Sequence, residues 1–144
     1  MAADRTAHVT WSGSLMEGSG TITSVESGAF GPLDVTWAAR AEDESAGLTS
    51  PEELIAAAHA ACFSMALSHG LAQAGTPPDT LDVDATLTFV PGTGITKVAL
   101  SVRGAVAGLD AAEFADAAET AKDNCPVSKA LASVPEISVE ASLV

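Results

Sequence analysis

The stretch from Ser50 to Gly75 reads SPEELIAAAHAACFSMALSHGLAQAG and predicts one long helix. Ser50 can cap its amino-terminal end, Pro51 suits the first helical position, and Gly75 with Pro77 beyond it ends the helix. The residues are apolar or small on nearly every face, which is typical of a helix buried all round. A chain of 144 residues can hardly surround such a helix by itself, because about 24 residues extend about 36 Å. A second subunit would solve this problem, so we expect a dimer.

Strands are predicted on both sides of this helix, where β-branched residues alternate with polar ones between glycine and proline turns. This alternation indicates sheets with one face exposed to water. A second helix is expected from the capping box at Asp110 and Glu113 to about Asp123, and a short third helix starts at Cys125. No linker divides the chain, which predicts a single domain over residues 1–144. The expected strands are Val9–Ser12, Gly20–Glu26, Leu33–Trp37, Leu81–Val90, Ile95–Arg103 and Glu136–Val144.

The composition is that of a folded, acidic protein. Lys and Arg total 6 against 19 Asp and Glu, a net charge of −13 that repels nucleic acid. The charged fraction of 17% argues against disorder. Residues 1–8 lack the apolar core of a signal peptide, so a cytoplasmic location is expected. The apolar stretch Leu54–Leu71 carries His59 and His69, so we expect no membrane span and no membrane partner.

Two cysteines are the candidates for chemistry. In a chain without an export signal, Cys62 and Cys125 are not expected to form a permanent disulfide. They could be inert core thiols, metal ligands or a redox pair. Cys125 lies at a helix start, where the helix dipole favours a thiolate. Cys62 lies in mid-helix and needs a nearby cation, for which Arg40 is best placed and His59 is the alternative.

The two histidines of the long helix are predicted to have structural roles. A single histidine on an apolar helix is more often a hydrogen-bonded core residue, and we expect this of His59 and His69. A metal site made of these two with Cys62 and Cys125 matches no zinc spacing. A thiol hydrolase using Cys62 and His59 is disfavoured, because neighbours three residues apart on one helix rarely align as a catalytic pair.

One cysteine lies in each of two distinctive segments, Ser50–Ser68 and Ala121–Ser128. These two segments resemble the OsmC/Ohr family, the osmotically inducible protein C and organic hydroperoxide resistance proteins of bacteria. Weaker similarity includes Trp11–Gly13 and Ala38–Glu42. The chain resembles the OsmC branch, which takes its catalytic arginine from a strand, at the position of Arg40. It departs from the family in a longer, more acidic connection before the helix, and in Ser50 where asparagine is common.

The resemblance implies an α+β homodimer in which antiparallel sheets wrap around long central helices, with active sites at the interface. It also implies reduction of organic hydroperoxides to alcohols, with Cys62 as the attacking thiol and Cys125 as its disulfide partner. Arg40 would hold the Cys62 thiolate and Glu52 would fix the guanidinium. A dithiol, such as a lipoyl group on another protein, would restore the cysteines. No metal, haem or flavin cofactor is required.

The spacing along the helix adds two expectations. Glu52 precedes Cys62 by about 15 Å of helix, so Arg40 and Glu52 of one chain are expected to complete the site of the other. Apolar neighbours of Cys62 are expected to favour bulky hydroperoxides; the candidates are Phe63, Met65 and Leu67. Two other functions stay open, a non-catalytic stress protein and a redox-sensing or ligand-binding homologue.

Overall fold

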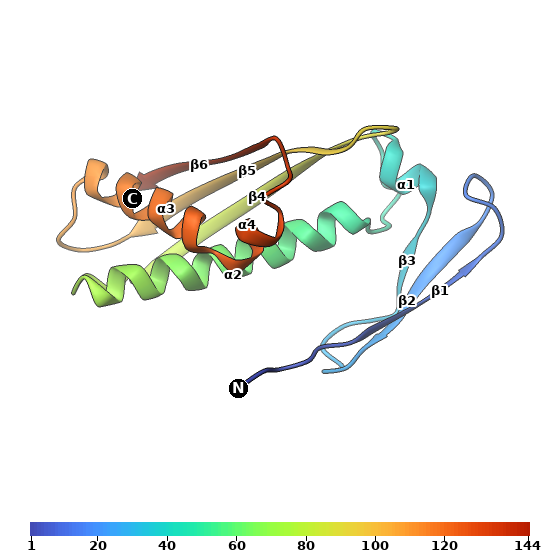
Figure 1. The fold of residues 1–144 in the computed structure, drawn as a ribbon, viewed down its shortest axis with the longest axis horizontal. Helices are drawn as coiled ribbons and strands as arrows, with labels where there is room; N and C mark the ends of the chain where they lie inside the picture. The colour runs from blue at the N-terminus through green and yellow to red at the C-terminus, as the bar shows by residue number, and fades with distance from the viewer. The chain divides into compact units, whose positions relative to one another are not determined.

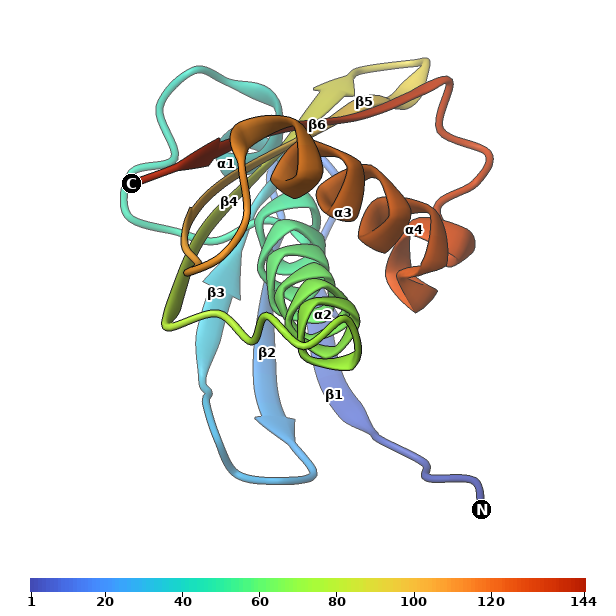
Figure 2. The same ribbon diagram turned by 90° about the vertical axis from the view of Figure 1, so that its left-hand side faces the viewer.

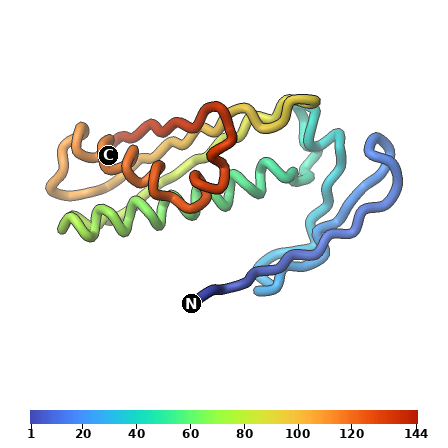
Figure 3. Tube along the Cα trace, in the orientation of Figure 1, coloured from blue at the N-terminus to red at the C-terminus, as the bar shows by residue number.

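The structure is a computed structural model that describes all residues from Met1 to Val144, in two compact units. The first unit is Met1–Pro51. Its strands β1 (Ala7–Ser12), β2 (Ser19–Val25) and β3 (Leu33–Val35) form an antiparallel sheet in the order β1-β2-β3, drawn in blue and cyan in Figure 3. The short helix α1 (Trp37–Ala41) follows.

Arg40 lies on α1 and not on a strand, which differs from the strand position that the family resemblance implies. The expected strand Leu33–Trp37 ends at Val35, and Trp37 begins the helix. The physical reason is local: the Thr36 hydroxyl accepts a hydrogen bond from the Ala39 N–H at 3.1 Å and caps an alanine-rich turn.

The second unit, Glu52–Val144, holds the other helices and strands (Figure 1). Their bounds are α2 (Pro51–Gln73), β4 (Thr80–Val90), β5 (Gly94–Ala105), α3 (Ala111–Asn124), α4 (Pro126–Ala130) and β6 (Glu136–Leu143). β4 and β5 form the predicted antiparallel hairpin. β5 and β6 pair in parallel, unlike the all-antiparallel arrangement expected, because α3 and α4 form a crossover that returns the chain to the starting end of the sheet.

The predicted helix boundaries are confirmed. α3 begins with a capping box, in which the Glu113 N–H donates to Asp110 and the Asp110 N–H donates to Glu113, each at 2.9 Å. α4 begins at Pro126 with Cys125 as its N-cap, as the cysteine-proline pair predicts. α2 spans nearly the whole predicted range.

The core of the second unit lies between one face of the sheet and the helices α2 and α3, which cover that same face in Figure 2. Phe63 of α2, Val102 of β5 and Phe114 of α3 are at most 1% exposed and contribute to one cluster. The approach of α3 to the sheet requires a glycine, because a Cβ on Gly104 would lie 2.5 Å from the Phe114 ring. Cys125 is fully buried in this cluster, and its N–H donates to the Ala121 carbonyl at 2.8 Å.

Within one chain, α2 is buried on one face only. Its buried residues, spaced mostly four apart, are Glu52, His59, Phe63, Leu67 and Leu71. Met65, between two of them, is 72% exposed, so the expected burial on all faces is not reached within a single chain. The length and hydropathy of α2 also suffice for a membrane span, but core helices of globular proteins meet the same criteria.

Candidate active site

The fold brings the two cysteines together inside the second unit. Cys62 projects from the middle of α2 and is partly buried, whereas Cys125 joins α3 to α4 and is fully buried. Both thiols are free, and they lie near enough for each to shift the pKa of the other. Two neighbouring thiols can form a disulfide once one of them is oxidised.

Cys125 is the more acidic thiol of the pair. Burial raises its pKa, but hydrogen bonds outweigh this effect and the net pKa lies below the usual value. The donors are, in order of effect, the Ser128 N–H, the Cys62 thiol, the Ser128 hydroxyl and the Val127 N–H. These donors belong mainly to the first turn of α4, so the turn that positions Cys125 also stabilises its thiolate.

Cys62 has the opposite shift. Burial raises its pKa, the Val127 N–H partly compensates, and the interaction with Cys125 raises it again. Because the pKa of Cys125 is lowered and that of Cys62 is raised, the first negative charge within this unit resides mainly on Cys125. A thiolate on Cys62 therefore needs a further positive group, which is the role that the sequence analysis gave to Arg40.

His59 and Ser128 form a second polar pair next to the cysteines. His59 is fully buried one turn before Cys62, and its Nε2 lies 2.7 Å from the Ser128 Oγ. Burial lowers the pKa of His59, so the imidazole is neutral near pH 7. Sequence reasoning expected a hydrogen-bonded core histidine but missed Ser128. The signal was available, because Ser128 stands three residues after the N-cap, where a side chain can face the capping group.

Arg40 and Glu52 lie in different units. Arg40 is partly buried on α1, and its guanidinium carbon is 6.0 Å from the centre of the Trp37 ring, a cation–π contact. Glu52 lies in the first turn of α2 and is only 7% exposed. A carboxylate buried to this extent requires a charged or hydrogen-bonding partner. Their predicted arrangement around Cys62 stays a prediction.

The three residues expected to contact substrate do not share a surface. Phe63 and Leu67 are buried in the core between α2, β5 and α3. Met65 lies on the exposed side of α2 and borders a hollow with Ser64 and Pro78. The predicted apolar contact with substrate therefore stays a prediction.

The four residues considered as metal ligands do not form a cluster. His69 is exposed about two turns after Cys62, whereas His59 is fully buried. Nowhere in the chain do three or more His, Cys, Asp or Glu side chains form a group that could hold a metal ion.

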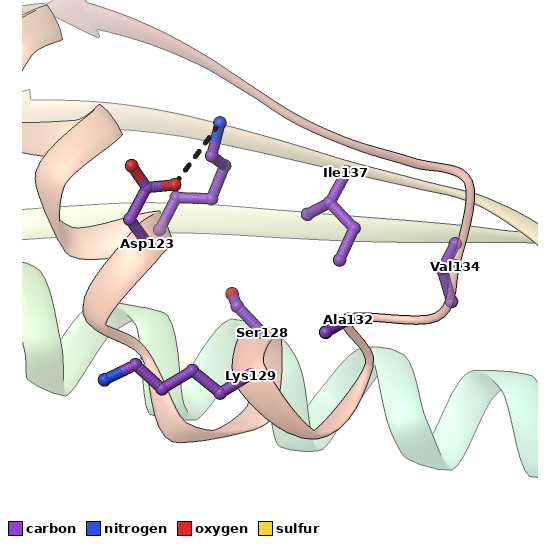
Figure 4. Close-up of a pocket in the computed structure, with 7 residues that line it drawn as sticks. Asp123, Ser128, Lys129, Ala132, Val134 and Ile137 are labelled. Carbon is purple, nitrogen blue, oxygen red and sulfur yellow. Dashed lines mark ion pairs between the residues drawn. The ribbon is translucent and has the colours of Figure 1, made fainter.

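A hollow of about 340 Å³ lies beside Ser128, between α3, α4 and β6 (Figure 4). Its charged border consists of Lys122, Asp123 and Lys129, and Val134 and Ile137 contribute apolar surface. The Lys122 ammonium pairs with Asp123 at 3.9 Å, so these charges are partly balanced at the hollow itself.

Comparison with known proteins identifies the family. Residues 42–140 match the family model described as OsmC-like protein. The chain belongs to the OsmC family. It is 44% identical over 124 residues to the peroxiredoxin OsmC of Escherichia coli (strain K12), which covers 84% of this chain and 85% of the relative. The peroxiredoxin OsmC of Shigella flexneri matches equally well.

Solved structures of OsmC-family relatives share the fold. The organic hydroperoxide resistance protein OhrB of Bacillus subtilis has a TM-score of 0.65 and 28% identity, over 96% of this chain and 98% of that one. A putative organic hydroperoxide resistance protein of Vibrio cholerae, with captopril in one active site, has a TM-score of 0.68 and 26% identity, over 99% and 94% of the two chains. The predicted α+β fold and the OsmC branch are confirmed.

Proposed function

We propose that this protein is a thiol-dependent peroxidase that reduces organic hydroperoxides to alcohols. The observation that carries the proposal is the proximity of Cys62 on α2 to Cys125 at the start of α4, beside one core cluster. The similarity to relatives named peroxiredoxin OsmC supports a peroxidase, and the names of the organic hydroperoxide resistance proteins support the substrate class.

The first step oxidises Cys62. Its thiolate attacks one peroxide oxygen, an S–O bond forms, and the O–O bond breaks with its electron pair leaving on the alkoxide. The alkoxide takes a proton and departs as the alcohol, which leaves a sulfenic acid on Cys62. The peroxide is reduced by two electrons and the sulfur is oxidised by two.

The second step uses Cys125. Its thiolate attacks the Cys62 sulfur, the S–S bond forms, and the hydroxide that leaves takes a proton to become water. The lowered pKa of Cys125 suits this role, because a thiolate is the attacking species at neutral pH. An external dithiol, such as a lipoyl group on another protein, then reduces the disulfide and is itself oxidised.

The raised pKa of Cys62 explains why a cation is required for the first step. Arg40 is proposed to hold the Cys62 thiolate and to stabilise charge on the peroxide oxygens, with Glu52 fixing the guanidinium. Glu52 is about 15 Å of helix away from Cys62, which supports a site completed by Arg40 and Glu52 of a second chain.

A homodimer is supported by surfaces that a single chain leaves uncovered. The exposed side of α2 carries Met65 and small residues such as Ala57 and Ala61. Light scattering at micromolar concentration should give the mass of two chains, and the mass of one chain would contradict the dimer.

The substrate preference follows from apolar burial. Each methylene removed from water contributes about 0.8 kcal/mol, so a bulky alkyl or aryl hydroperoxide should react with a higher kcat/KM than hydrogen peroxide. Phe63, Met65 and Leu67 remain the proposed apolar contacts, and Met65 is the exposed one of the three. The reaction is expected in the cytoplasm, where thiols stay reduced.

The proposal is tested by a pulse of cumene hydroperoxide on the reduced protein, followed by intact-protein mass spectrometry. Cys62→Ser should lose the rapid reaction. Cys125→Ser should react once and then progress to sulfinic and sulfonic acids, since no second thiol captures the sulfenic acid. The reversed result would exchange the two roles. Absence of any turnover by the unmodified protein with lipoamide or thioredoxin as reductant would favour a non-catalytic or redox-sensing protein.

A further inference from the structure

His59 is the buried titratable side chain to which the proposed peroxidase steps give no role. It is fully buried on α2, and its Nδ1 has no hydrogen-bond partner. The neighbouring core cluster is built from apolar side chains such as Phe63, Leu67 and Leu100. An imidazole costs free energy in such surroundings, whereas a leucine would pack there without a polar atom to satisfy. This cost indicates that the imidazole, through its one hydrogen bond to Ser128, has a functional role.

Ser128 connects His59 to the resolving cysteine. It is 7% exposed in the first turn of α4, and its Oγ lies 2.7 Å from the His59 Nε2. It stands three residues after the N-cap Cys125, and its hydroxyl is one of the groups that lower the Cys125 pKa. A serine hydroxyl has a single proton to donate. When that proton points at the Cys125 thiolate, the Ser128 oxygen must accept its other hydrogen bond from the Nε2–H of His59.

The environment of Nδ1 agrees with this direction of donation. With the proton on Nε2, the unpartnered Nδ1 is an acceptor lone pair. With the proton on Nδ1, a buried N–H would lack a partner, which proteins tolerate less often. The neutral imidazole with its proton on Nε2 therefore fits both ends of the pair.

We propose that His59 and Ser128 form a hydrogen-bond relay that holds Cys125 as the attacking thiolate of the disulfide-forming step. The Nε2–H of His59 donates to the Ser128 Oγ, and the Ser128 O–H donates to the Cys125 Sγ. No proton moves along the relay, which only stabilises the electron pair that attacks the Cys62 sulfur. His59 is thus a positioning residue. The purpose of the relay rests on the proposed peroxidase, but the relay itself is a property of the reduced protein.

Other charged or titratable groups near this relay are few. Cys62 of α2 also contacts Cys125. Lys122 and Asp123 of α3 and Lys129 of α4 border the hollow beside Ser128 in Figure 4. The lysines and Asp123 are unchanged in every variant below, and Cys62 is replaced by serine in all of them. Their effects on the Cys125 pKa therefore cancel when the variants are compared.

The test measures the Cys125 pKa directly, from the ultraviolet absorbance of the thiolate as a function of pH. The reduced protein carries Cys62→Ser throughout, so that a single thiol titrates. Ser128→Ala should raise the pKa by about one to two units, the size expected when a hydrogen bond to a charged group is lost. His59→Leu should raise it by a smaller amount, because Ser128 can still donate but is no longer oriented. His59→Gln, which keeps an N–H donor, should leave the Cys125 pKa close to its value with His59 present.

A double-mutant cycle separates the relay from general packing. If His59 acts through Ser128, His59→Leu should have no further effect on the pKa once Ser128→Ala is present. Leu71→Ala is the packing control, a core residue of α2 three turns from His59 that should lower stability and leave the pKa unchanged.

The relay is overturned if His59→Leu leaves the pKa unchanged, or shifts it equally with and without Ser128. The titration uses no peroxide, so a protein without peroxidase turnover still decides the relay. Conversely, a failed relay leaves the mass-spectrometric test of the two cysteines intact.

Discussion

The two units of the chain differ in how much of their own core they possess. The second unit buries nine residues in one cluster, including Cys125. In the first unit Ile22 is the only buried apolar side chain, every residue of β1 is exposed, and Trp11 is 41% exposed. A three-stranded sheet needs a packed apolar face to be stable. The cysteine pair therefore lies in the unit with the larger apolar core, whereas Arg40 belongs to the unit with a single buried apolar side chain.

Amide hydrogen exchange should show the largest difference between the units. The amides of β5 should open only with global unfolding, while those of β1 should exchange roughly a thousandfold faster through local opening. Mass spectrometry of peptides from the two strands measures both rates. Equal protection in dilute protein would refute the comparison. Protection of β1 that rises with protein concentration would show that a second chain covers it.

Substituting Arg40 tests whether the first unit contributes to chemistry in the second. Arg40→Ala should lower kcat/KM for cumene hydroperoxide by about 10²- to 10³-fold, the usual effect of losing one charge-stabilising donor. The kcat/KM of Arg40→Lys should lie between those of Arg40→Ala and the unsubstituted protein, since lysine keeps the charge but lacks the planar guanidinium. Arg103→Ala, at an exposed ion pair with Asp82, is the control that should retain activity. An unchanged kcat/KM in Arg40→Ala would show that the thiols of the second unit react with the hydroperoxide without Arg40.

Two glycine substitutions test how tightly the second unit is packed. Gly104→Ala should lower the free energy of unfolding by about 1–3 kcal/mol, because the new Cβ would overlap the buried Phe114 ring. Gly70→Ala, on α2 with no atom within 4 Å of the new Cβ, should raise it by about 1 kcal/mol through helix propensity. Urea unfolding measures both. A loss of stability in Gly70→Ala would indicate that a second chain packs against that part of α2.

The smallest expected effect is the acid dependence of stability. Burial lowers the pKa of His59 below 6.5, so below that pH the unfolded chain binds a proton that the folded chain does not. His59 therefore does not lower the free energy of unfolding above pH 6.5. It lowers it increasingly as the pH falls from 6.5 toward the pKa of His59 in the folded chain. His59→Leu should flatten this part of the curve, whereas His69→Leu, at an exposed site, is the control. Urea unfolding between pH 7 and pH 5 gives both curves.

The sequence predicted the local elements well because their signals are local. The capping box at Asp110 and Glu113, the break after Gly75 and the alternation in β4 each act within a few residues, and each was confirmed. The strand before Arg40 was predicted to end at Trp37 and ends at Val35 for the same kind of reason. Its segment has a strand-like start, but the Thr36 cap starts a helical turn that alternation does not report.

What the sequence determined by itself was the family, the order of helices and strands apart from the short helix α1, and the two cysteines as candidates for chemistry. Tertiary structure alone decided the parallel pairing of β6, the single buried face of α2, and the placement of His59 against Ser128. These features join residues that are distant in the chain, and a sequence pattern carries no record of which distant side chains meet. The acidity of Cys125 belongs to both levels, because its helix-start position can be read from the sequence, while its burial and its contact with Cys62 arise only when α2 and α4 pack together.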